Sequence, residues 1–161
     1  MEAIRKKSAQ LPIKVISEYY ERGEIYDLLA MADCYVSLHR AEGFGLPLAE
    51  AMYLGKPVIA TAYSGNMDFM NVNNSYLVRY TLVELEKDIG PYGKSALWAE
   101  PDTAHAGELM SFTYSNRDAA KSIGRIAAGQ VRSTLDSKVL GRQILKRLDI
   151  ISRSNQYHHM P

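Results

Sequence analysis

Residues 41–61 read A-E-G-F-G-L-P-L-A-E-A-M-Y-L-G-K-P-V-I-A-T, a stretch that predicts a tight turn, a short helix and a buried strand. The helix is expected to begin at Leu46, because Pro47 then stands in the first turn, where its missing N–H removes no helical hydrogen bond. Gly55 ends the helix, and Pro57 prevents its continuation. The apolar run that follows is the expected strand.

The turn before this helix suits an anionic ligand. Gly43 and Gly45 allow a sharp turn and the close approach of a ligand to the backbone. The free amides and partial positive charge of a helix N-terminus hold anions such as a diphosphate. Glu42 precedes the turn, and Glu50 follows Gly45 at roughly 7.5 Å along the helix axis. Carboxylates on either side of a diphosphate suit a nucleotide sugar, because they accept hydrogen bonds from its hydroxyl groups.

These motifs resemble a known family. Two glutamates separated by seven residues, with G-F-G-L after the first and A-M-x-x-G-x-P-V-I-A-T after the second, resemble the retaining GT-B glycosyltransferases of family 4. The resemblance runs from about residue 13 to residue 148. Upstream it includes I-Y-D-L-L-A-M-A-D-C-Y-V-S-L-H-R, and downstream Y-S-G-N-M-D-F-M, N-S-Y-L-V and W-A-E-P-D, which are similar to a bacterial branch of the family. It implies sugar transfer from a nucleotide-diphosphate sugar with retention of configuration, in bacterial polysaccharide or glycoconjugate synthesis.

The resemblance also implies roles for individual residues. Glu42 is the expected catalytic residue, which binds sugar hydroxyls or stabilises the charge that develops at the anomeric centre. Glu50 is expected to hold the ribose hydroxyls. The other expected donor-binding residues are Gly43, Phe44, Gly45, Leu46 and Arg40. The residues expected to line the pocket are His39, Ser64, Gly65, Asn66, Tyr19 and Tyr20.

The expected fold is α/β, with a Rossmann-like parallel sheet flanked by helices, as in part of a GT-B C-terminal domain. Buried strands are predicted at residues 13–17, 34–38, 58–61 and 76–79, with a helix over 24–32. The nearly continuous apolar character of residues 34–38 is typical of a parallel sheet that is covered on both faces. The pocket residues follow the first three strands, and open α/β sheets bind ligands at the carboxyl ends of their strands.

The remainder of the chain is predicted to be a surface loop and then helices. Residues 80–96 lack periodicity and contain Gly90, Pro91 and Gly93, which indicates a loop. Three helices are expected to follow, with caps at Asp102 or Thr103, at Ser115 in a capping box with Asp118, and at Asp136 or Ser137. The last helix carries an apolar stripe, Leu140, Ile144, Leu148 and Ile151. This stripe either packs in the core or lacks part of its partner.

Length and composition predict one soluble domain over residues 1–151 and a disordered tail at 152–161. Neither a membrane span nor a signal peptide is recognisable, and the single cysteine indicates a reducing, cytoplasmic setting. Residues 117–153 carry nine Lys/Arg and three Asp/Glu, a net charge of +6. This charge indicates either solvated helix faces or peripheral contact with anionic lipid at the inner face of the membrane. Nucleic-acid binding is not expected, because no recognition motif accompanies the charge.

No cofactor or metal is expected, since the nucleotide sugar is a substrate and no Asp-x-Asp pair or zinc spacing occurs. The resemblance further implies that the N-terminal GT-B domain, which binds the acceptor, and the first strands of the donor domain lie outside this chain or in a partner chain. An uncovered sheet edge makes a homodimer a candidate assembly. Two functions therefore stay open: a retaining transferase that needs its other half for transfer, and a non-catalytic fragment that binds nucleotide or a partner chain.

Overall fold

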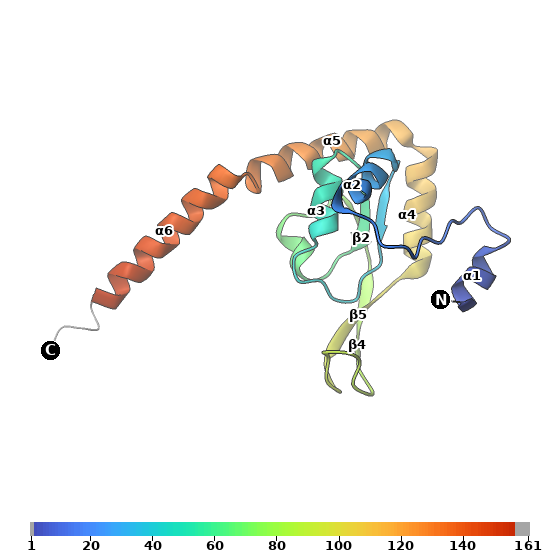
Figure 1. The fold of residues 1–161 in the computed structure, drawn as a ribbon, viewed down its shortest axis with the longest axis horizontal. Helices are drawn as coiled ribbons and strands as arrows, with labels where there is room; N and C mark the ends of the chain where they lie inside the picture. Colours follow the sequence, from blue (N-terminus) through green and yellow to red (C-terminus); the bar gives the residue numbers. More distant parts are fainter. Residues whose placement is uncertain (1, 157–161) are drawn as a thin grey trace.

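A three-stranded parallel sheet lies at the centre of the computed structural model, which describes residues 2–156 (Figure 1). Its strands are β1 (Tyr35–Ser37), β2 (Val58–Thr61) and β3 (Tyr76–Val78), in the order β1-β2-β3. The registers pair Val36 with Ile59 and Ala60 with Leu77. The mixed α/β architecture, with a parallel sheet flanked by helices, is therefore as the sequence predicts.

Helices cover both faces of the sheet, and the side chains of β2 alternate between them. On one face, Val58 and Ala60 join a core with Leu29 of α2 (Arg22–Met31), with α3 (Leu46–Tyr53) and with α5 (Arg117–Thr134). On the other face, Ile59 packs with Val78 of β3 and Ala106 of α4 (Thr103–Ser115). All four residues of β2 are fully buried, which accounts for the apolar run at 58–60, and Thr61 is the buried polar residue at its end.

The turn into α3 has the expected form, but only one of its two glycines needs a special conformation. Gly45 caps the helix with φ 91°, in the left-handed region that favours glycine, and Pro47 lies in the first turn. Gly55, with φ 74°, follows the end of the helix. Gly43 lies in the bend that precedes the helix, as expected, but it does not adopt a positive φ.

Residues 13–17 do not form the predicted strand. They run as irregular chain between α1 (Glu2–Ser8) and α2, and Ile13 is 55% exposed. Apolar, β-branched residues favour a strand only where a neighbouring strand and a covering layer bury them. No ladder joins this segment to β1, whose only strand partner among the described residues is β2.

The predicted loop at 80–96 begins with a strand. β4 (Tyr80–Glu84) pairs antiparallel with β5 (Leu97–Pro101), and the resulting ribbon extends from the body of the molecule (Figure 1). Only the connection between the two strands is loop. The sequence shows no alternation of apolar and polar residues over β4 because this strand is largely solvent-exposed on both faces. Trp98 of β5 packs edge-on against Tyr92, with ring centroids 5.4 Å apart.

The C-terminal helices begin near the predicted positions, with one difference in capping. The Asp102 carboxylate accepts the His105 amide at the start of α4, as expected. The predicted Ser115–Asp118 capping box is absent, because Asn116 takes the N-cap of α5 and makes no side-chain cap. Asp136 accepts the Lys138 amide, 2.8 Å away, at the start of α6 (Ser137–Gln156).

α6 leads away from the body (Figure 1). Ile144 and Leu148 are 60% and 56% exposed, so the interpretation of its apolar stripe as core packing is wrong. The helix includes residues 152–156, where a disordered tail was expected, and 157–161 lie outside the described residues. Within residues 2–156, no helix combines the length and apolar character that a membrane span requires.

Candidate functional site

The loops that follow β1 and β2 meet at the carboxyl ends of these strands. The Gly65 amide donates to the Glu42 carbonyl oxygen, 3.1 Å away, and the Ser64 hydroxyl donates to the same oxygen at 2.6 Å. A β-carbon added to Gly65 would lie 2.0 Å from the Gly43 carbonyl oxygen. Only glycine therefore permits this approach, which brings the second loop beside the Glu42 turn.

Glu42 bonds to the backbone of its own turn. Its Oε1 accepts the Gly45 amide at 3.0 Å, immediately before α3. Within α3, the amides of Leu46 and Leu48 have no carbonyl partner four residues earlier in the helix, and Pro47 has no N–H. The carboxylate thus lies beside the positive end of the helix, where donors remain for an anionic ligand.

Glu50 lies one to two turns into α3 and faces α2. Its Oε1 accepts the Tyr26 hydroxyl at 2.7 Å, and Arg22 Nη2 is 3.5 Å from the same oxygen. Neither Tyr26 nor Arg22 is among the residues predicted from the sequence. Their spacing of four residues places them on one side of a helix, but nothing in the sequence indicates which helix that side faces.

A cavity of about 670 Å³ opens between α2, α3 and the junction of α5 with α6. Glu50 and Tyr26 lie in its wall, together with the aromatic rings of Phe44 and Tyr53. The Phe44 ring packs against Phe69, with centroids 5.2 Å apart, and this contact holds the Phe44 ring at one side of the cavity opening. Because the cavity combines a carboxylate with apolar surface, it suits a ligand with hydroxyl groups and a flat, partly apolar part.

His39 and Asn66 connect the loop after β1 to the loop after β2 through hydrogen bonds. His39 Nε2 faces two acceptors, the Tyr63 carbonyl at 3.0 Å and Asn66 Oδ1 at 3.2 Å. Its ring proton therefore lies on Nε2, and Nδ1 accepts the Ser37 hydroxyl at 3.3 Å. Asn66 is fully buried and donates to the Thr61 carbonyl. In this arrangement both side chains hold the two loops together through hydrogen bonds.

The side chains of three predicted residues, Arg40, Tyr19 and Tyr20, make no hydrogen bond to the site residues described above. Arg40 forms two hydrogen bonds with Glu100 of β5, at 2.6 and 2.7 Å, and this pairing lowers the pKa of Glu100. Tyr19 is 89% exposed and Tyr20 is partly exposed. No hydrogen bond in the described part of the chain links either tyrosine to the loops after β1 and β2.

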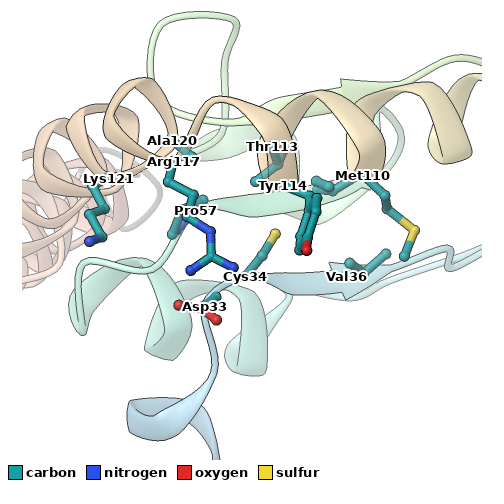
Figure 2. Close-up of a pocket in the computed structure, with 11 residues that line it drawn as sticks. Asp33, Cys34, Val36, Pro57, Met110, Thr113, Tyr114, Arg117, Ala120 and Lys121 are labelled. Carbon is teal, nitrogen blue, oxygen red and sulfur yellow. The ribbon is translucent and has the colours of Figure 1, made fainter. Parts of the chain in front are cut away.

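A second cavity, of about 290 Å³, lies at the opposite, amino end of β1 and β2 (Figure 2). Its lining is mostly apolar, with Cys34 and Val36 of the β1 segment facing α4 and α5. Arg117 extends toward Asp33 at its edge (Figure 2). Burial, together with the Asp33 charge, raises the pKa of the Cys34 thiol to about 11, so the thiol is protonated at neutral pH. We therefore place the candidate site at the other end of the sheet.

No cluster of three or more His, Cys, Asp or Glu side chains that could hold a metal ion occurs in the described part of the chain. The donors gathered at the site are backbone amides, hydroxyls and carboxylates instead. Such groups suit a ligand that carries both hydroxyls and an anion.

Comparison with known proteins gives one family match. Residues 4–81 match a family model described as glycosyl transferases group 1, and they include Glu42, Glu50 and both site loops. No curated protein matches the chain. The family match supports the expected relationship to glycosyltransferases.

Several solved structures share the fold. Anabaena HepE in complex with UDP is 22% identical with a TM-score of 0.60, covering 80% of this chain and 30% of HepE. HepE in complex with UDP and glucose is 19% identical with a TM-score of 0.66, covering 92% and 35%. Sucrose-phosphate synthase from Thermosynechococcus elongatus is 16% identical with a TM-score of 0.72, covering 95% and 34%. The chain thus spans about a third of each protein, and these likenesses show a GT-B-like fold.

Proposed function

We propose that this chain is the donor-binding part of a glycosyltransferase that uses a nucleotide-diphosphate sugar. The observation that carries the proposal is the placement of Glu42 and Glu50 on either side of the α3 N-terminus, inside the segment that matches the group 1 family model. The structural neighbour HepE was solved with UDP, and with UDP and glucose, which makes UDP the first nucleotide to test.

In this proposal the diphosphate lies at the N-terminus of α3. The amides of Leu46 and Leu48 and the helix dipole stabilise its charge, which increases as the bond from the anomeric carbon to the phosphate oxygen breaks. Glu42 exchanges its hydrogen bond with the Gly45 amide for hydrogen bonds from sugar hydroxyls. Glu50 accepts hydrogen bonds from the ribose hydroxyls. Transfer with retention of configuration, and a role in polysaccharide or glycoconjugate synthesis, are further parts of the proposal.

One observation favours the alternative, in which the chain binds nucleotide without transferring sugar. Arg40 is the only cation among the predicted donor-binding residues, and two hydrogen bonds hold its side chain on Glu100. A diphosphate with few positive partners binds weakly, and transfer also requires an acceptor held close to the anomeric carbon. The purified chain alone should move no label in either case, so the separating experiment is a radiolabelled-donor assay with an N-terminal GT-B domain supplied as a separate chain. Only the donor-binding part of a transferase then moves label to an added acceptor.

Both the transferase and the non-catalytic alternative require nucleotide binding. Calorimetry and thermal shift against UDP, GDP, ADP and their sugars test this shared requirement. We expect saturable binding of at least one nucleoside diphosphate, which survives EDTA because no metal is proposed. Glu50→Ala should weaken it, while Glu86→Ala, which removes an exposed glutamate distant from the site, should not. Failure of every nucleotide to bind would contradict the proposal. Loss of binding in EDTA with recovery in Mn²⁺ would contradict its metal-free form.

A further inference from the structure

A tyrosine on α2 holds the carboxylate of Glu50. The Tyr26 hydroxyl donates to Glu50 Oε1 at 2.7 Å. Arg22, one turn earlier on α2, donates to the Tyr26 hydroxyl oxygen at 3.1 Å and lies 3.5 Å from the same Oε1. The Glu50 side chain is 18% exposed, whereas that of Arg22 is 77% exposed. The carboxylate is therefore largely withdrawn from water and is held by a bridge between two helices.

The two oxygens of this carboxylate differ in their surroundings. Oε1 faces both Tyr26 and Arg22, while no hydrogen bond to Oε2 occurs in the described part of the chain. An ionised carboxylate only accepts hydrogen bonds, and each of its oxygens has room for two. Since Glu50 lies in the wall of the 670 Å³ cavity, Oε2 is the oxygen left for a hydroxyl donor that enters it.

Resting on the function proposed above, we propose that Tyr26 is a specificity-determining residue for the ribose of the donor nucleotide. It acts through Glu50 as a positioning residue: its hydroxyl occupies Oε1 and restricts the carboxylate to one orientation, in which Oε2 accepts a ribose hydroxyl. A preorganised acceptor binds more tightly because fewer rotamers are lost when the ligand arrives.

Arg22 does not replace Tyr26 in this role. Its side chain is exposed and its guanidinium lies 3.5 Å from Oε1, so solvent screens the attraction. Its hydrogen bond goes to the Tyr26 hydroxyl and not to the carboxylate. Without the tyrosine hydroxyl, the carboxylate gains rotamers and can turn toward the arginine. The binding that depends on the ribose hydroxyls is then lost, while contacts with the base and diphosphate persist.

This proposal predicts a pattern across two ligands. A nucleotide without ribose hydroxyls leaves Oε2 without a donor, and a site built to accept a hydroxyl discriminates against such an analogue. The native chain should therefore bind UDP about tenfold more tightly than 2′,3′-dideoxy-UDP, as expected for one hydrogen bond to a charged group. Tyr26→Phe should bring this ratio close to one by weakening UDP alone.

Titration calorimetry of the full chain with both nucleotides tests the proposal. The variants are Tyr26→Phe and, as a control for loss of a tyrosine hydroxyl, Tyr92→Phe in the ribbon connection, which should keep the native ratio. In the Glu50→Ala background, Tyr26→Phe should cause no further change, because its effect passes through the carboxylate. The melting temperature of each variant reports whether it is folded.

Three results would overturn the proposal, and they are distinguishable. An unchanged UDP preference in Tyr26→Phe removes the role of Tyr26 but leaves the proposed function standing. Equal weakening of both nucleotides with a lower melting temperature assigns Tyr26 a structural role only. If the native chain binds no nucleoside diphosphate of the panel, the proposed function fails and this inference fails with it.

The nucleotide pair follows the outcome of the panel. If the native chain binds another nucleoside diphosphate in place of UDP, the same test uses that compound and its dideoxy form.

Discussion

Gly65 lies directly against the backbone of Gly43, so that a β-carbon on Gly65 would meet the Gly43 carbonyl oxygen at 2.0 Å. The relationship is not symmetric, because a β-carbon on Gly43 meets nothing within 4 Å. Gly65 is therefore required for the packing of the two site loops. Gly43 leaves space in front of the turn, as the close approach of a ligand would need.

Gly65→Ala should destabilise the chain and Gly43→Ala should not. An added methyl group that meets backbone forces the loops apart, at a cost of about 1–3 kcal/mol. Urea denaturation measures both free energies of unfolding. In the proposed function, Gly43→Ala nevertheless weakens nucleotide binding, because its methyl group then meets the ligand. Equal stability losses in the two variants would contradict the asymmetry.

Gly124→Ala should destabilise the packing of α5 on α3, whereas Gly129→Ala on the same helix should stabilise the chain. A β-carbon on Gly124 would lie 2.1 Å from the Gly55 carbonyl oxygen, while one on Gly129 meets nothing within 4 Å. We expect a loss of about 1–3 kcal/mol for the first variant and a gain of about 0.5–1 kcal/mol for the second. Thermal denaturation of both variants measures whether their changes in stability have opposite signs.

The two glutamates should differ in their ligand dependence. Glu50→Ala should weaken the plain nucleoside diphosphate by about 1.5–3 kcal/mol, because the ribose loses a charged acceptor. Glu42→Ala should affect the plain diphosphate less and the sugar-bearing donor more. Calorimetry with UDP and a UDP-sugar compares the four affinities. If both variants weaken both ligands equally, the separate roles are wrong.

The pairing of Arg40 with Glu100 predicts a gain of affinity from removing an acid. Glu100→Gln should free Arg40 for the diphosphate and tighten nucleotide binding about threefold at low salt, with a smaller effect at high salt. Arg40→Ala should weaken binding. Calorimetry at two ionic strengths measures both effects. If neither substitution changes the affinity, Arg40 is not a donor-binding residue.

Cys34 should be unreactive at neutral pH and should make stability fall at high pH. Burial raises the pKa of its thiol from 9.0 to about 11, so the unfolded chain loses this proton at a lower pH than the folded chain. The stabilising contribution is therefore fully present below pH 9 and is lost as the pH rises through 11. Comparison with Cys34→Ala isolates this effect from other titrating groups. Iodoacetamide at pH 8 should modify the native thiol more slowly than the thiol of the urea-unfolded chain.

The turn, helix and strand of residues 41–61 were predictable because their signals are local. Gly45 takes the left-handed conformation that its own lack of a side chain allows, and Pro47 and Gly55 mark the helix through the backbone groups next to them. The cap at Asp102 is of the same kind, since its carboxylate reaches an amide three residues away. The sequence by itself therefore determined the central elements and which loops lie at the carboxyl ends of the strands.

The tertiary structure alone decided which distant side chains meet. Residues 13–17 have the composition of a strand, but a strand also needs a neighbour, and its identity is not encoded in those five residues. The β4–β5 ribbon, the Arg40–Glu100 pair and the Tyr26–Glu50 bond likewise join segments far apart in the chain. Such contacts depend on how helices and strands pack in space. Sequence patterns indicate which face of an element is apolar, but they do not indicate which polar residue another element brings to it.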